Sequence, residues 1–323
     1  MEKDLKKNIF LVIDGSAIVH RAYHAMPSLT TPDGIPTGAV HGFFSMLLKL
    51  MQELHPSHVA VAFDRPKPNF RKELYKEYQS QRPSMESDLS PQFEIIQNIL
   101  TIARIPVYFM DGFEADDIIG TLADKAEQAG DISYIVTGDR DMMQLVDKRT
   151  KVLVPIKGIS EMKLFDEDRV VEQFGVLPTQ IVELKALQGD ASDNYPGVSG
   201  VGPKTAAGLI QSYKSVENIY KNLEAIRTKN PKLADKLTAG HNHAILAHQL
   251  ATILKNVPFE YNYNDCRAEN ISLEDWRKAF ESYSFKTLPK RLNEAFGIDS
   301  TDSGSKKSKG RNEKNNNSQM KLI

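Results

Sequence analysis

The sequence predicts an α/β fold with a mainly parallel central sheet flanked by helices, followed by a helical region. Short apolar runs of strand type alternate with segments of helical period over the first half of the chain, which is typical of a parallel sheet covered by helices. Carboxylates follow the ends of four of these runs. From Pro178 to about Asn256 the patterns are helical throughout.

Length and composition limit the possible classes of protein. The 323 residues allow two domains or one large core, and 41% hydrophobic with 26% charged residues is ordinary for a soluble protein. No run approaches the roughly 18 apolar residues of a membrane span, and the first apolar run ends at Asp14, too early for a signal peptide. The single cysteine, Cys266, excludes an internal disulfide and a cysteine-rich zinc site. We expect a cytoplasmic monomer with no membrane partner.

Four apolar runs are expected to lie side by side as strands, at residues 9–13, 59–63, 106–109 and 134–137. Seven carboxylates follow their ends: Asp14, Asp64, Glu114, Asp116, Asp117, Asp139 and Asp141. Parallel strands end at the same sheet edge, where α/β proteins bind ligands, so these side chains should converge. Such a cluster repels itself unless cations hold it together, and hard oxygen ligands suit Mg²⁺ or Mn²⁺. The sequence therefore predicts a metal-dependent enzyme acting on phosphate esters.

Helices are expected between these strands. Apolar residues recur at helical spacing over 42–54 and 93–103, and a third helix is expected over 115–129, with Gly130 as its C-terminal cap. Between them, residues 70–91 mix basic, aromatic and proline residues. We interpret this segment as exposed, partly helical and mobile, with a solvated connecting helix as the alternative.

The last part of the chain is expected to return to the core. Residues 258–263 are expected to form an edge strand, and 273–283 an amphipathic helix that packs through its apolar side. After Asp299 the composition is polar and typical of disorder. The expected division is an α/β core over 1–177, a helical region over 178–257, a segment packing back on the core over 258–298, and a polar, basic tail over 299–323.

Two acidic motifs have the spacing that a shared ion requires. Glu114, Asp116 and Asp117 open a helix, and the first and last of these can face the same way because they are three residues apart. Asp139 and Asp141 are two apart, so in an extended loop both can reach one ion. The alternatives are helix capping for the first motif and a polar turn for the second.

A third motif joins two carboxylates to a glycine-rich loop. Asp190 and Asp193 lead directly into a stretch containing Gly200, Gly202 and Lys204. Two glycines let a backbone approach a phosphate closely, and the amide groups of the helix that follows would bind it together with the lysine. We interpret this stretch as a helix-hairpin-helix contact to a nucleic-acid backbone.

The net charge permits a nucleic-acid partner. The formal value of −1 becomes +8 when the nine carboxylates of the predicted metal site are set aside. Bound metal ions would offset the acidic pocket, which leaves a mildly basic surface elsewhere.

These motifs together resemble the 5′-nuclease domains of bacterial DNA polymerase I, within the flap endonuclease family. They follow one another in this order: Asp14-Gly15-Ser16, Arg21-Ala22-Tyr23-His24, Phe63-Asp64, Phe70-Arg71, Glu114-Ala115-Asp116-Asp117, Thr137-Gly138-Asp139-Arg140-Asp141, Gly189-Asp190-Ala191-Ser192-Asp193-Asn194 and Gly200-Val201-Gly202-Pro203-Lys204-Thr205-Ala206. The resemblance implies a PIN-like fold and a 5′→3′ exonuclease that also cuts 5′ flaps. Its substrates would be DNA flaps, nicks and duplex ends, and RNA primers, in bacterial replication and repair near the nucleoid.

The resemblance also implies a role for each site residue. One of two Mg²⁺ or Mn²⁺ ions would be held by Asp14, Asp64, Glu114, Asp116 and Asp117. The other would lie nearer Asp139, Asp141, Asp190 and Asp193. The catalytic residues would be Asp14, Asp64, Asp116, Asp139, Arg82 and Lys76. The DNA contacts would be Arg21, Tyr23, Arg71, Lys76, Arg82, Gly200, Gly202, Lys204 and Thr205. Residues 70–91 would form an arch for the single strand, and the hairpin loop is also a candidate K⁺ site.

Two departures from the family leave alternatives open. Gln79 stands where the arch usually has a lysine that contacts the reacting phosphate, and Lys76 could substitute from the same helical face. No polymerase sequence follows, so the chain is expected to be a stand-alone nuclease or one part of a longer protein, with a DNA polymerase as partner. The second hypothesis is a DNA-binding module that has lost catalysis. A metal-dependent phosphatase is the third, and Ser16 disfavours it because that chemistry usually needs a second aspartate there.

Overall fold

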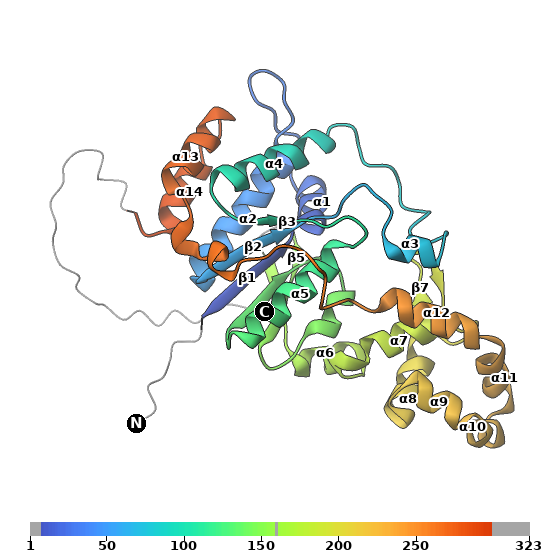
Figure 1. The fold of residues 1–323 in the computed structure, drawn as a ribbon. Helices are drawn as coiled ribbons and strands as arrows, with labels where there is room; N and C mark the ends of the chain where they lie inside the picture. Colours follow the sequence, from blue (N-terminus) through green and yellow to red (C-terminus); the bar gives the residue numbers. More distant parts are fainter. Residues whose placement is uncertain (1–7, 159–160, 299–323) are drawn as a thin grey trace, which may run out of the picture.

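A six-stranded sheet forms the centre of the molecule in the computed structural model, which describes residues 8–158 and 161–298 (Figure 1). Its order is β3-β2-β1-β4-β5-β6, and every neighbouring pair is parallel except β5 with β6. The strands are β1 Ile9–Asp14, β2 His58–Ala62, β3 Val107–Tyr108, β4 Ile132–Val136, β5 Thr150–Lys157 and β6 Glu161–Phe165. The predicted mainly parallel sheet is therefore confirmed, whereas β5 and β6 were not foreseen.

Alternation along β1 places helices on both faces of the sheet. Leu11 and Ile13 pack into one core with helices α1, α2, α4, α13 and α14, and Phe10 and Val12 pack into the other with α5. Successive strand residues point to opposite faces, so both sides of this central strand are apolar. The helices are α1 Gly15–Ala25, α2 Gly38–Leu54, α4 Ser90–Ile102, α5 Ala115–Gln128, α6 Glu167–Phe174, α13 Leu273–Ser282 and α14 Leu288–Ala295.

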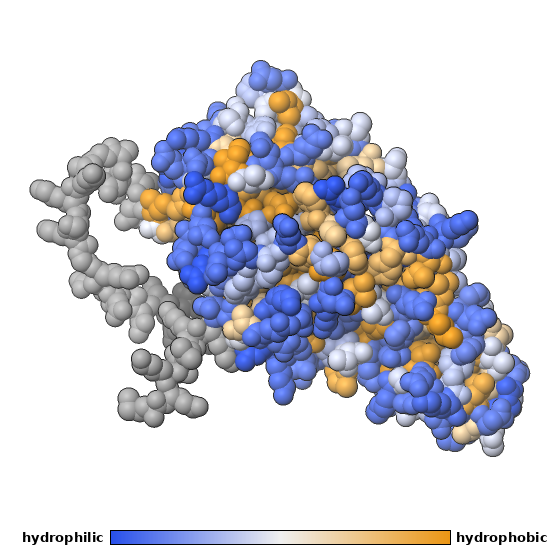
Figure 2. All heavy atoms as spheres, in the orientation of Figure 1, coloured by the Kyte–Doolittle hydropathy of each residue, from blue (hydrophilic) through white to orange (hydrophobic). Residues whose placement is uncertain are grey.

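A group of helices forms one end of the molecule, opposite α13 and α14 (Figure 1). They are α7 Ile181–Gln188, α8 Pro203–Tyr213, α9 Val216–Lys221, α10 Leu223–Lys229, α11 Pro231–Ala239 and α12 His241–Ala251. On the face drawn in Figure 2, hydrophilic side chains cover most of the end formed by α8–α11. The region is not wholly helical as predicted, because β7 Gly189–Asp190 and β8 Tyr195–Pro196 form a hairpin. A Cβ on Gly197 would lie 2.2 Å from the backbone nitrogen of Gly189, so this close crossing requires glycine.

Most of the segment 70–91 is exposed and it is partly helical, as predicted, but some of its side chains are buried. It contains one short helix, α3 Phe70–Leu74, and two of its side chains, Arg71 and Tyr78, are each 2% exposed. Both are buried because they bond to carboxylates in the interior.

The edge strand expected over 258–263 does not form. Phe259, Tyr261 and Tyr263 instead pack against the core on the α5 side of the sheet, where Phe259 contacts the ring of Tyr108 at 5.3 Å between centroids. Because these rings pack against the core, the segment runs across this face of the sheet and does not pair along its edge. Trp276 of α13 is wholly buried, as predicted for a helix that packs through its apolar side.

Short 3-10 helices complete the description: η1 Asp141–Leu145, η2 Pro178–Gln180, η3 Tyr263–Cys266 and η4 Ala268–Asn270. Within residues 8–158 and 161–298, no helix is both long enough and apolar enough to cross a membrane. The polar tail expected over 299–323 lies outside the described residues.

Candidate active site

One edge of the sheet gathers carboxylates from several strands. Asp14 is the last residue of β1, and Asp64 lies two residues beyond β2. Parallel pairing of β1 with β2 and β4 puts these ends together with the loop that carries Asp139. Asp14 therefore feels the charges of both Asp64 and Asp139, and Asp116 at the start of α5 feels all three. The convergence expected from the strand order is present in the structure.

Burial and mutual repulsion oppose ionisation of these groups. Burial, followed by the charge of Asp64, raises the pKa of Asp14 to about 7. Burial and the charges of Asp139 and Asp14 raise the pKa of Asp116 well above its usual value. Burial also raises the pKa of Glu114 to about 7, although a neighbouring guanidinium lowers it in part. Such groups bind either protons or cations, so the cluster has the electrostatics of a metal site.

A second acidic group adjoins the first and has the donor set of a hard cation. Asp141 begins η1, Asp190 ends β7, and Asp193 lies in the turn of that hairpin. Each offers a carboxylate oxygen, and the three oxygens lie within 4.8 Å of one another. Two of the residues are buried and the third is half-buried. Oxygen ligands alone, at this density, fit Mg²⁺ or Mn²⁺.

Lys185 of α7 lies inside this second group and was not identified from the sequence. Its ammonium group is 2.5 Å from Asp141 Oδ1 and also forms an ion pair with Asp190. Burial alone would raise the pKa of Asp190, but hydrogen bonds from Lys185 and Ser192 hold it below its usual value. An internal cation therefore partly balances this group. Its only sequence signal is a lysine five residues before Asp190 in a half-apolar helical run.

Replacing Lys185 by methionine is expected to destabilise the metal-free protein and to strengthen divalent-ion binding. Asp141 and Asp190 would lose their shared cation, and an ion would then gain more by neutralising them. Thermal unfolding in chelator and then in a Mg²⁺ series measures both effects. The Mg²⁺-induced rise in Tm should be larger in this variant than in the unchanged protein. An equal or smaller rise would contradict the role of Lys185 as the cation that balances Asp141 and Asp190. Lys290→Met, at a side chain 80% exposed on α14, is the control.

Three side chains from residues 78–82 reach the carboxylates. Tyr78 donates its hydroxyl to Glu114 and Asp193 (3.2 and 3.1 Å). The Gln79 amide also lies between Glu114 and Asp193 (3.1 and 3.2 Å), and its residue adopts a left-handed backbone with φ of 54°. Arg82 donates to Asp193 at 2.7 Å. The residue that departs from the family pattern, Gln79, is therefore at the acidic site itself.

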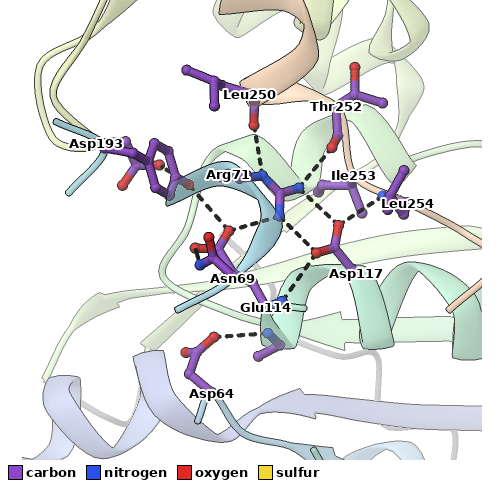
Figure 3. Close-up of polar contacts among 12 residues, drawn as sticks. Asp64, Asn69, Arg71, Glu114, Asp117, Asp193, Leu250, Thr252, Ile253 and Leu254 are labelled. Carbon is purple, nitrogen blue, oxygen red and sulfur yellow. Dashed lines mark hydrogen bonds and ion pairs between the residues drawn. The ribbon is translucent and has the colours of Figure 1, made fainter. Parts of the chain in front are cut away.

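Arg71 and Asp117 occupy different places from those predicted (Figure 3). Asp117 is wholly buried and accepts two hydrogen bonds from Arg71, at 2.7 and 2.8 Å. Its carboxylate also accepts the backbone amides of Glu114 and Leu254. With its guanidinium enclosed, Arg71 is not available to a DNA strand, and Asp117 already has partners for both oxygens. We therefore revise both assignments from ligand contact to structural support.

The other predicted contacts near the 5′ end lie on α1 and in the segment 70–91. Arg21 donates to the carbonyl of Ile156 at 2.7 Å, and Tyr23 donates to Asp88 at 2.8 Å. Lys76 is exposed to solvent. Their contacts with DNA remain predictions.

The glycine-rich loop is exposed ahead of α8. Gly200, Gly202, Lys204 and Thr205 are all exposed, and α8 starts at the next residue after Gly202 with no side-chain cap. Its first amide groups are therefore free for an anion. Gly200 has φ of +75°, and its carbonyl accepts a hydrogen bond from Lys236 at 3.0 Å.

Comparison with protein families identifies the class to which this fold and acidic edge belong. Residues 9–175 match the family model of the 5′-3′ exonuclease N-terminal, resolvase-like domain. Residues 176–274 match that of the 5′-3′ exonuclease C-terminal SAM fold. The chain belongs to the 5′-3′ exonuclease family, which confirms the nuclease class predicted from the motifs.

Curated relatives are bacterial DNA polymerases I. That of Bacillus caldotenax is 39% identical over 288 residues, which are 89% of this chain and 32% of the relative. That of Bacillus subtilis is 37% identical over 284 residues, 88% of this chain and 32% of the relative. The chain thus spans about a third of the length of these relatives.

Solved structures share the fold at lower identity. A bacteriophage T5 5′-exonuclease with bound divalent metal ions (zinc) superposes with a TM-score of 0.62 at 20% identity, over 90% of this chain and 99% of that chain. The catalytic core of Rad2 in complex with a DNA substrate gives 0.57 at 16% identity, over 90% and 92%. Both structures support the α/β architecture with its appended helical region.

Proposed function

We propose that this chain is a metal-dependent 5′→3′ exonuclease and 5′-flap endonuclease acting on DNA and on RNA primers in replication and repair. The observation that carries the proposal is the meeting of two clusters of carboxylates at one sheet edge, in a chain that also presents an exposed glycine-rich loop ahead of α8. The T5 relatives include a flap endonuclease solved with DNA and metal ions, and the Rad2 core was solved with a DNA substrate. Both support the same class of substrate here.

The carboxylates fall into two candidate ion sites. Asp14, Asp64, Glu114 and Asp116 would hold one Mg²⁺ or Mn²⁺, and Asp139, Asp141, Asp190 and Asp193 the other. When bound, divalent ions in such a pair supply an activated water and stabilise negative charge on the leaving 3′-oxygen. The donor set of hard oxygen atoms supports this assignment, and a pair of ions makes a protein general base unnecessary.

The chain's own cations would hold the DNA strand. Arg82 lies at the edge of the acidic site and is placed to move from Asp193 to a phosphate. Lys76, three residues before Gln79, would add a second charge there. Farther away, the α8 start and Lys204 would bind the duplex backbone without reading its sequence, with K⁺ as a further candidate ligand of the hairpin loop.

Changing Lys204 to glutamine is expected to weaken duplex binding by a similar factor for all sequences. One phosphate contact contributes counterion release, so the slope of log K against log salt should fall by about one. Fluorescence anisotropy over a salt series measures that slope. Lys278→Gln, at a side chain 65% exposed on α13 and remote from the loop, is the control; an unchanged slope for the Lys204 variant would remove this contact.

A product-mapping assay tests the function as a whole. End-labelled 5′-flap, nicked and single-stranded substrates are incubated with and without Mg²⁺, and the expected products are short 5′ fragments formed only with metal. The second candidate is a DNA-binding module with weakened catalysis, favoured by the neutral Gln79 among the carboxylates. Tight flap binding without cleavage in either Mg²⁺ or Mn²⁺ would favour that candidate.

The relatives also suggest a setting for the enzyme. They are DNA polymerases I, so a polymerase is the proposed partner, and the chain is proposed to act as a cytoplasmic monomer near the nucleoid. The proposed division into a catalytic core over 1–177 and a DNA-binding region over 178–257 places the acidic residues Asp190 and Asp193 in the second part. Limited proteolysis with and without DNA would test that boundary.

A further inference from the structure

A buried ion pair joins three parts of the chain that lie far apart in sequence (Figure 3). Arg71 is 2% exposed and Asp117 is wholly buried, and they form a bidentate pair. Two further N–H groups of the guanidinium donate to the carbonyls of Leu250 and Thr252, both at 2.8 Å. The amide of Leu254 donates to Asp117 at 2.9 Å.

The pair therefore forms hydrogen bonds with the backbone of residues 250–254. We call these residues the connecting segment because they lead out of α12. On its other side, Gln144 of η1 accepts the amide of Ile253 at 3.0 Å and donates to the carbonyl of Ala251 at 2.9 Å. Two separate anchors thus attach the end of the helical region to the sheet domain.

The same pair also supports the acidic site. Arg71 lies 3.0 Å from Glu114 Oε2, and Asp117 accepts the amide of Glu114 at 3.1 Å. Glu114 and Asp116 lie at the start of α5. The guanidinium therefore contacts both this acidic helix start and the connecting segment at the end of the helical region. These bonds link the orientations of the two parts, alongside the apolar core that α5 shares with α7 and α8 and the ion pair between Lys185 and Asp141.

We propose that Arg71 and Asp117, with Gln144, are positioning residues that fix the register between the duplex-binding helices and the acidic site, and so determine which phosphodiester is cut. The proposal rests on the proposed nuclease function. A planar guanidinium bound in bidentate fashion is rigid, and in a dry interior its bonds are strong. Loosening them would let the duplex shift against the carboxylates without removing a DNA contact or a carboxylate of the acidic site.

The test uses two independent sets of changes. Arg71→Met combined with Asp117→Leu removes the pair without leaving an unpaired buried charge, which makes folding more certain than in either single variant. Gln144→Met removes the second anchor at similar volume. Leu292→Ala, in the wholly buried part of α14, destabilises the core elsewhere and serves as the control.

Cleavage of a flap labelled at its 5′ end is then mapped at single-nucleotide resolution. In both the double variant and Gln144→Met, products should spread to neighbouring positions, and kcat should fall roughly tenfold to a hundredfold because small misplacement is costly. Binding to duplex DNA should stay within about twofold, since no DNA contact is removed. Arg71→Lys keeps the positive charge but loses the planar fork. Its kcat and its spread of products should lie between those of the unchanged protein and those of the double variant.

The outcomes separate this proposal from its alternatives. A single sharp cleavage position in Gln144→Met, with a slower rate, overturns the positioning role and leaves only structural support. Equal scatter in Leu292→Ala would assign the effect to general destabilisation and would also overturn it. If the unchanged protein cuts no substrate, the proposed nuclease function itself fails, and that result is visible before any variant is compared.

Discussion

Replacing Asp139 by alanine is expected to reduce flap cleavage by at least about 10³-fold, because it removes one carboxylate from the site that would hold the catalytic ions. Flap binding should be nearly unchanged, since the exposed loop of α8 lies in a different part of the chain. Asp139 also accepts the amide of Asp141 at 2.8 Å, so the alanine variant could disturb η1. Asp139→Asn keeps an acceptor there and should lose a similar amount of activity.

The comparison needs a carboxylate outside the cluster. Asp168 is exposed in the first turn of α6 and belongs to neither acidic group; Asp168→Asn should cleave like the unchanged protein. Rates are measured under single-turnover conditions in saturating Mg²⁺, with DNA binding followed in Ca²⁺. Undiminished cleavage by both Asp139 variants would refute its place in the catalytic site.

The strand-end carboxylates could be predicted because a local signal coincided with a general rule of the fold. An apolar run of five residues predicts a buried strand, and Asp14 or Asp64 directly after it lies at the carboxyl end. Parallel order then brings those ends together without any knowledge of side-chain contacts. The same reasoning located Asp116 and Asp139, although these four carboxylates lie far apart along the chain.

Pairings across the interior could not be predicted in this way. Arg71 and Asp117 are 46 residues apart, and each has an obvious surface role in the sequence: a basic residue near aromatic ones, and an acid at a helix start. They become partners only in the folded chain, where α3 lies against α12 and Arg71 meets the start of α5. Lys185 was missed for a related reason, because a lysine on a half-apolar helix is usually solvated and nothing local indicates that its end enters an acidic pocket.

The prediction of an edge strand over 258–263 was wrong. Alternating apolar residues predict which side of a segment is buried, but they do not predict which strand its backbone pairs with. Phe259, Tyr261 and Tyr263 do share a buried side, as alternation predicts. The side is buried against the core near Tyr108 and not paired along β3, which is only two residues long. The outermost strand offers few backbone groups to pair with, and the aromatic contacts determine the path of the chain.

Metal-free protein is expected to lose stability as the pH rises from about 5 to about 7, and added Mg²⁺ should restore it mainly at the upper end. In the folded state the pKa of Asp14, Glu114 and Asp141 is raised to about 7 in each case, chiefly by burial. The folded protein therefore binds more protons than the unfolded chain in this interval, so the free energy of unfolding falls with pH until these groups are ionised. For Asp14 alone, a pKa raised from 3.8 to about 7 corresponds to a loss on the order of 4 kcal/mol by neutral pH.

Thermal unfolding in chelator at pH 5 and pH 7.5 measures the greater part of this loss, with an expected fall in Tm of roughly 10 °C. Asp190 does not oppose it in this range, because its pKa is lowered and its contribution is lost only in more acidic solution. Asp14→Asn keeps an acceptor for the amide of Ala17 at the start of α1 but removes the charge, so its Tm should fall less over the same interval. A Tm in chelator that rises from pH 5 to pH 7.5 would mean that burial and mutual repulsion do not oppose ionisation of the carboxylates, and the case for a pair of divalent ions would then lose its electrostatic basis.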